Sequence, residues 1–279
     1  MRSDGARDEW EDTPRSAGKA KRGTIDGDGA AAAPTGPPVT RKPLPVEVAA
    51  DIRKASSIAT ALHRERLVEK AESAYGAYTR NRFQDAYRAI KPVADEVPTV
   101  AAVRELTGLA AYRSGKWREA VKHLDAHAAM SDSSEHIPVL MDCQRALRKP
   151  KKVIALWDEL RQSSPEPDVL AEGRMVAAAS LAEMADLDGA ISLLASAGAT
   201  KALRNPSTRH IRQWYLLADL YERAGDVPRA REFFERVAKV DREAYDVLDR
   251  LANLGPERRP RTPTRRASVK KAPAEAATD

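Results

Sequence analysis

Five small or β-branched residues recur along the middle of the chain at a spacing close to 34 residues. They are Ala86, Ala120, Val153, Ala190 and Ala230, and the successive spacings are 34, 33, 37 and 40 residues. A period of this length indicates a supersecondary unit that buries its apolar face by stacking on its neighbours. Because chain-breaking residues interrupt the helical periodicity at short intervals, the sequence predicts paired helices of about 12 to 14 residues.

The clearest unit spans residues 211–244. Large side chains flank small ones in it at fixed positions, which are Trp214, Leu217, Ala218, Tyr221, Gly225, Ala230 and Phe234. Small residues at a crossing point let two antiparallel helices approach, and large residues fill the remaining volume. We expect Gly225 to end the first helix in a left-handed conformation and Asp226 to cap the second, with Pro228 in its first turn.

This pattern resembles the tetratricopeptide repeat, except that Arg242 stands where a proline usually closes the unit. The same template fits residues 67–100 and 101–134, which abut without a gap, and it fits residues 134–167 and 171–204 with more departures. The resemblance implies an all-α fold, an α-solenoid of about five TPR-like helical hairpins with capping helices. A generic helical bundle or another α-solenoid is the alternative. The alanine- and arginine-rich usage also resembles that of repeat scaffolds from high-GC, actinobacterial-type bacteria.

The sequence predicts a repeat domain over residues 44–254 between two disordered tails. Residues 1–43 mix both charge signs with Gly, Pro and Ala, a composition that cannot bury enough apolar surface to order itself. Residues 255–279 hold seven basic and three acidic residues, a net charge of +4 out of the chain's +6. Segments 46–64 and 243–254 have the apolar residues to cap the two ends of the stack.

The resemblance implies that the first helix of each hairpin lines a concave face that binds a partner peptide or helix. By position, the expected lining is Tyr75, Tyr78, Leu109, Tyr112, Arg113, Asp142, Arg145, Tyr215 and Asp219. Tyrosine and arginine commonly anchor interfaces, although some of these side chains could serve local packing alone. A protein-protein interaction scaffold or adaptor of unknown partner is therefore the first hypothesis for function.

One subtype of the family grips a C-terminal carboxylate with Lys and Asn at fixed first-helix positions. Those positions carry residues such as Ala71, Tyr75, Leu106 and Val139 here, so the resemblance does not extend to that clamp.

The residues that could suggest catalysis or metal binding favour structural interpretations. His123 and His127 are four apart, but Leu124 stands where a zinc-protease helix would place its glutamate. With His136 nearby, we expect solvated or interface histidines and no metal site, adventitious binding being the minor alternative. The single cysteine, Cys143, reads as a small buried hydrophobe or a partly exposed thiol. We expect neither an enzyme nor a cofactor, and a core role for Trp117 and Trp157.

The second hypothesis places function in the basic tail. Residues 258–271 could bind nucleic acid weakly and non-specifically, although no aromatic residue there could stack on bases. Arg265, Arg266 and Ser268 resemble a site for basophilic kinases, so Ser268 is a candidate phosphosite. A third hypothesis is an accessory subunit of an enzyme. Since no apolar stretch approaches the ~20 residues of a membrane span and no secretion signal is apparent, we expect a cytoplasmic protein.

Overall fold

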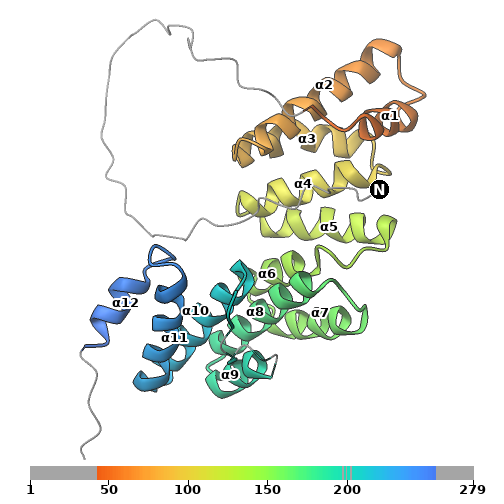
Figure 1. Ribbon diagram of the computed structural model, residues 1–279. Coiled ribbons are helices and arrows are strands. Elements are labelled where there is room, and N and C mark those ends of the chain that lie inside the picture. The colour runs from red at the N-terminus through yellow and green to blue at the C-terminus, as the bar shows by residue number, and fades with distance from the viewer. Residues whose placement is uncertain (1–42, 197, 199, 202, 256–279) are drawn as a thin grey trace, which may run out of the picture.

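The computed structural model describes residues 43–196, 198, 200–201 and 203–255 (Figure 1). Over these residues the chain forms twelve α-helices and no strand. The helices are α1 Val46–Ala55, α2 Ala61–Tyr78, α3 Phe83–Glu96, α4 Ala101–Arg113, α5 Trp117–Ser131, α6 Ile137–Ala146, α7 Pro150–Gln162, α8 Pro167–Glu183, α9 Leu187–Ala195, α10 Thr208–Arg223, α11 Val227–Val240 and α12 Val247–Asn253.

Ten of these helices pair into five hairpins, α2/α3, α4/α5, α6/α7, α8/α9 and α10/α11. The hairpins follow one another as successive layers, with α1 against the first hairpin and α12 against the last (Figure 1). This arrangement confirms the predicted α-solenoid of five hairpins with a flanking helix at each end. Within the described part of the chain, none of the helices combines the length and apolar character needed to cross a bilayer.

Every hairpin turns through one residue in the left-handed conformation. These residues are Asn81, Gly115, Arg148, Ala185 and Gly225, with φ between 58° and 79°. In each turn the next residue donates its N–H to the carbonyl five positions earlier, as in Asp226 to Tyr221 at 2.9 Å and Asp186 to Leu181 at 3.0 Å. This is the Schellman arrangement that closes helix C-termini. Each left-handed residue precedes one of the recurring small positions by five residues, so the turn and the helix crossing repeat together.

The predicted cap of the last hairpin is confirmed. The Asp226 carboxylate accepts a hydrogen bond of 3.1 Å from the backbone N–H of Arg229, and Pro228 lies in the first turn of α11. The carboxylate of Asp186 plays the same part for α9, accepting from Gly189 at 2.9 Å. A carboxylate at this position satisfies an N–H that the first turn of a helix leaves without a partner.

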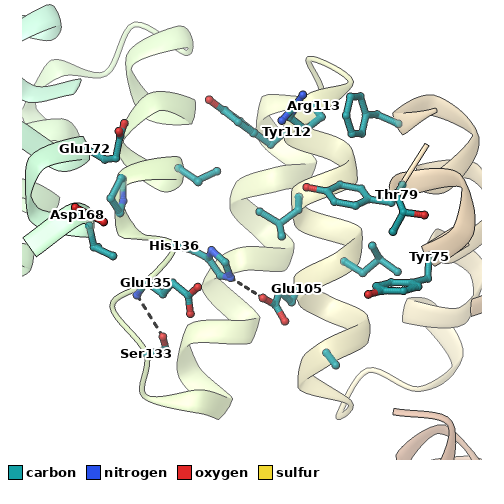
Figure 2. A pocket seen from close by; sticks show the side chains of 18 of the residues that line it. Tyr75, Thr79, Glu105, Tyr112, Arg113, Ser133, Glu135, His136, Asp168 and Glu172 are labelled. Carbon is teal, nitrogen blue, oxygen red and sulfur yellow. Dashed lines mark hydrogen bonds and ion pairs between the residues drawn. The ribbon is translucent and has the colours of Figure 1, made fainter. Parts of the chain in front are cut away.

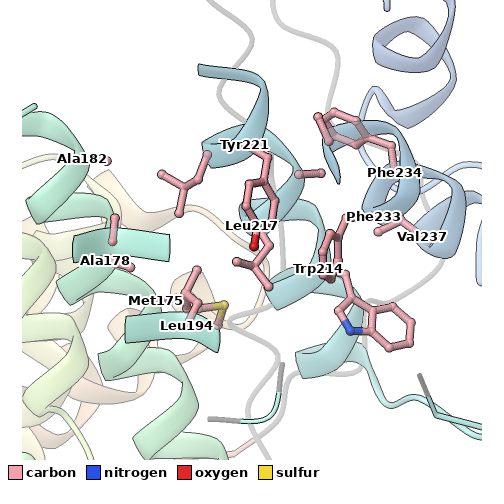
Figure 3. Packing of buried hydrophobic residues seen from close by; sticks show 14 of the residues in the cluster. Met175, Ala178, Ala182, Leu194, Trp214, Leu217, Tyr221, Phe233, Phe234 and Val237 are labelled. Atoms are coloured by element: carbon pink, nitrogen blue, oxygen red, sulfur yellow. The ribbon is translucent and has the colours of Figure 1, made fainter. Parts of the chain in front are cut away.

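The buried residues form four clusters that follow one another along the chain rather than one centre. The recurring small positions Ala86, Ala120, Val153, Ala190 and Ala230 are all fully buried in them. Figure 3 shows the last cluster, where Trp214, Leu217 and Tyr221 of α10 pack with Phe233 and Phe234 of α11 and with Met175, Ala178 and Leu194 of the preceding hairpin. Burial of apolar area in each junction therefore holds one hairpin on the next.

At two glycines a neighbouring helix comes so close that an added Cβ would collide with it. A Cβ on Gly108 of α4 would lie 2.6 Å from Cγ of Leu124 and 3.2 Å from the Leu124 backbone nitrogen in α5. A Cβ on Gly173 of α8 would lie 2.2 Å from Cδ2 of Leu160 in α7. The first contact lies within a hairpin and the second between hairpins, so both kinds of junction depend on the absence of a side chain.

Helix lengths differ from the expected 12 to 14 residues in several hairpins. The first helices α2, α8 and α10 have 18, 17 and 16 residues. Helix α2 begins at Ala61, where Thr60 accepts from the N–H of His63, so part of the segment 46–64 belongs to the first hairpin rather than to the cap. Helix α6 is short, with 10 residues, because Pro138 lies in its first turn.

Candidate partner-binding groove

A groove of about 1310 Å³ runs along one face of the stack. Its walls come from the first helices α2, α4, α6, α8 and α10, from Val48 of α1 with Leu44 and Pro45 before it, and from residues of the connections such as the segment 133–136 before α6. The second helices contribute only Phe83 and Ile90 of α3. Figure 2 shows Tyr75 of α2 and Thr79, the residue that follows α2, on one side of α4, with His136 on the other side.

Five of the sequence-predicted residues line this groove: Tyr75, Tyr78, Leu109, Tyr112 and Arg113. Aromatic contacts fix several of these side chains before any partner binds. The guanidinium of Arg113 lies 4.3 Å from the centre of the Phe83 ring, and Tyr78 meets the same ring edge-on at 5.3 Å. A pre-organised aromatic surface loses little conformational entropy on binding.

The remaining predicted residues lie elsewhere. Asp142, Arg145 and Tyr215 line a second hollow of about 250 Å³ between α6, α8 and α10, next to Tyr245. Asp219 lines neither hollow, and its carboxylate accepts a hydrogen bond of 2.7 Å from Arg250 of α12. The predicted lining residues are therefore divided between two hollows, and Asp219 instead binds the terminal helix α12.

Several of these polar groups are bonded between hairpins. The Tyr112 hydroxyl donates to Asp142 at 2.9 Å, and Arg145 donates to Asp142 from Nε at 2.9 Å and also binds Glu183 of α8. Burial, and then the charge of Asp142, raises the pKa of Tyr112 above its ordinary value. Tyr215 donates to Asp246, and burial again raises the pKa of the phenol. Both phenols therefore stay protonated as hydrogen-bond donors at neutral pH.

No protein-family model and no curated protein matches the amino-acid sequence. Among solved structures, the chain is similar to the tetratricopeptide-repeat protein TTC0263 of Thermus thermophilus, with a TM-score of 0.52 and 15% identity over 67% of this chain and 98% of that one. This chain has a tetratricopeptide-repeat fold. The repeat solenoid is also similar to a chain of the APC/C hetero-tetramer Cut9–Hcn1, with a TM-score of 0.52 and 12% identity over 74% of this chain and 39% of that one.

The tetratricopeptide-repeat groove contains charged residues that the sequence reasoning missed. They are Glu105, Glu135, His136, Glu166, Asp168, Glu172, Arg209 and Arg212. Arg209 binds Asp168 and Arg212 binds Glu172, so these pairs join α10 to α8. The sequence gives little indication of these residues. The paired residues are about one repeat apart, and several of the charged residues lie in or next to the connections between hairpins.

The histidines of the repeat domain differ from expectation. His123 is fully buried rather than solvated, and its Nδ1 lies 3.1 Å from the guanidinium of Arg104. His127 lies instead beside His136, with ring centres 5.4 Å apart. Both histidines of α5 contact α4, His123 through the side chain of Arg104 and His127 through the carbonyl of Ala101.

The four clamp positions Ala71, Tyr75, Leu106 and Val139 all line the groove of the repeat domain, where they add to its apolar surface. Cys143 is buried, and burial raises the pKa of its thiol to about 12, so it behaves as a small hydrophobe. Trp157 is buried and Trp117 packs partly buried against the core, as expected. Ser268 and the basic segment 258–271 lie outside the described residues, and the hypotheses built on them stay predictions.

Proposed function

We propose that this tetratricopeptide-repeat domain is a non-catalytic protein-interaction scaffold that binds a peptide or helix of a partner protein in the groove between α2, α4 and α6. The observation that carries the proposal is the groove itself, of about 1310 Å³ and lined by first helices of all five hairpins. Hairpins and flanking helices take up the described residues, so no separate catalytic domain stands among them.

The chemistry of the lining favours a peptide with apolar side chains. Tyr75, Tyr78 and Tyr112 present aromatic surface with polar tips, and Leu106 and Leu109 separate them. Such residues provide most of the binding energy at interfaces between proteins. The similar Cut9–Hcn1 structure was solved as a hetero-tetramer, which supports a role in assembly for this solenoid as well.

The charges of the lining favour a partner segment that also carries basic side chains. Five carboxylates line the groove against three arginines, and two of those arginines already bind Asp168 and Glu172. The third, Arg113, lies on the Phe83 ring. The remaining negative field would attract lysine or arginine and would repel an acidic peptide. We also propose the cytoplasm as its location, which the single buried cysteine supports.

A three-way capture experiment tests the proposal. The full chain, a groove variant with Tyr75→Ala and Leu109→Ala, and the control Ile154→Ala would each capture proteins from the source cells. Ile154 is an exposed apolar residue on a second helix, α7, outside the groove lining. We expect partners that the groove variant loses and the control keeps. A synthetic peptide from such a partner should then bind the full chain and lose at least about tenfold in affinity for the groove variant.

Undiminished capture by the groove variant would defeat the proposal, provided that its circular dichroism and melting temperature show a folded domain. Equal loss in the Ile154→Ala control would place binding on the outer face instead.

A further inference from the structure

Three side chains with metal-ligating atoms meet at the wall of the groove. Glu105 comes from α4, His127 from α5 and His136 from the N-cap of α6. One ligand atom from each lies within 4.8 Å of the other two. Figure 2 shows His136 and Glu105 pointing toward each other across the junction of the second and third hairpins, at 2.8 Å between Nε2 and Oε1.

The hydrogen bonds of His127 are compatible with metal binding through Nε2. Its Nδ1 lies 3.1 Å from the carbonyl oxygen of Ala101, and a carbonyl can only accept, so Nδ1 carries the proton. Nε2 is then left as the lone-pair nitrogen, next to Oγ of Ser131 at 3.2 Å. A backbone carbonyl that fixes the far nitrogen of a histidine is the usual outer support of a metal-bound imidazole. The ring is also buried, which holds its position.

The distances leave little to rearrange. Zinc binds nitrogen and carboxylate oxygen at about 2.0–2.2 Å, so ligand atoms in a tetrahedral site lie roughly 3.4 Å apart. The closest pair here is 2.8 Å apart, and all three atoms lie within 4.8 Å of one another. Side-chain rotations that move the ligand atoms by about 1 Å would therefore bring all three within reach of one ion. The ion would separate Glu105 from His136.

We propose that Glu105, His127 and His136 bind a divalent transition-metal ion, with Zn²⁺ as the first candidate. Two imidazoles and one carboxylate suit zinc, whereas magnesium and calcium prefer oxygen ligands throughout. Three protein ligands leave the fourth position of the ion open. Because Glu105 and His136 line the groove, that position faces the space where a partner would lie, and a partner's histidine or carboxylate could complete the site. The metal site does not depend on the proposed function.

Zinc binding to the tag-free full chain, freed of metal by a chelator, tests the proposal. We expect one zinc ion per chain by elemental analysis after dialysis. His136→Gln and Glu105→Gln should each weaken zinc binding by roughly 100-fold or more, since changes outside the ligand set already cost about 10–100-fold. His63→Gln is the matched control. His63 also contacts a carboxylate, Glu96 at 2.5 Å, but belongs to no three-ligand group found among the described residues.

Thermal melts separate a lost site from a misfolded variant. Zinc should raise the melting temperature of the parent chain and of His63→Gln, and should leave that of Glu105→Gln unchanged. Glu105 is partly exposed in the groove wall, so its replacement by the isosteric Gln should keep the metal-free fold. Equal zinc affinity in all four proteins, or no binding to the parent chain, would overturn the proposal.

Discussion

The hydroxyl of Tyr112 donates a 2.9 Å hydrogen bond to the carboxylate of Asp142, and so joins the second hairpin to the third. Both residues come from first helices, α4 and α6, and Asp142 also holds Arg145, which reaches Glu183 of α8. A chain of polar contacts thus crosses three hairpins through their first helices. Tyr112 therefore has a structural role in addition to any contact it makes with a partner.

Removal of this hydroxyl should loosen the junction. Tyr112→Phe should lower the free energy of unfolding by about 1 kcal/mol, because Asp142 loses a hydrogen bond in a partly buried place. Tyr75→Phe is the control, since the described residues show no hydrogen bond from the Tyr75 hydroxyl, and it should change stability by only a few tenths of a kcal/mol. Urea denaturation of both variants makes the comparison. Equal losses would mean that the bond adds no net stability.

Gly108→Ala should destabilise the second hairpin. The new Cβ would lie 2.6 Å from Leu124 and 3.2 Å from its backbone, so α4 and α5 must move apart, at a cost of about 1–3 kcal/mol. Gly76→Ala in α2 should instead be neutral or stabilising by up to ~1 kcal/mol, because its Cβ would meet only the mobile end of the Arg80 side chain at 3.4 Å. Gly108→Ala should therefore lower the melting temperature, whereas Gly76→Ala should leave it unchanged or raise it.

Ala185→Gly should stabilise the fourth hairpin. Ala185 has φ of 67°, where a Cβ is strained and glycine is not. Relief of that strain should raise the free energy of unfolding by roughly 0.5–1 kcal/mol. Ala179→Gly, in the interior of α8, should lower it by about 1 kcal/mol. Chemical denaturation distinguishes the two, and a loss in both variants would show that the turn is not strained.

His123 should make the fold less stable in mild acid. Burial, and then the charge of Arg104, lowers the pKa of His123 from 6.5 to about 4. Below pH 6.5 the unfolded chain takes up a proton that the folded chain refuses, so stability should fall as pH drops toward 4 and this contribution should then level off. The total loss is on the order of 3 kcal/mol.

Unfolding free energies between pH 7 and 4 check this expectation, with His123→Gln beside the parent chain. The variant should show a shallower slope in this window than the parent chain. An unchanged slope in His123→Gln would assign the acid sensitivity to other groups.

The sequence predicts the scaffold better than its groove. Recurring small residues such as Ala86 and Ala230 reveal the hairpins because each helix crossing imposes the same steric limit. Gly225 and Asp226 correctly predict the turn between α10 and α11, with its left-handed residue and its helix cap. Arg148 and Ala185 take the same left-handed turn without a glycine, so residue type alone gives no sign of it.

The polar partners could not be predicted because they depend on how hairpins stack. His136 binds Glu105, 31 residues earlier in the chain, and Arg250 binds Asp219 at the same separation. The second contact depends on the direction in which α12 follows α11. The lining by Tyr75 and Leu109 follows from helix register within one hairpin, which local spacing does specify. Binding by these groove residues stays a prediction until a partner is found.

The division of the buried residues into successive clusters has a consequence for how the molecule comes apart. Every substantial contact among the described helices joins helices at most two apart in chain order, so the first and last hairpins do not support each other directly. Fraying should therefore begin at a terminus and advance hairpin by hairpin, and amide hydrogen exchange should be slowest in the central layers. A partner lying across several hairpins would slow that fraying by tying distant layers together.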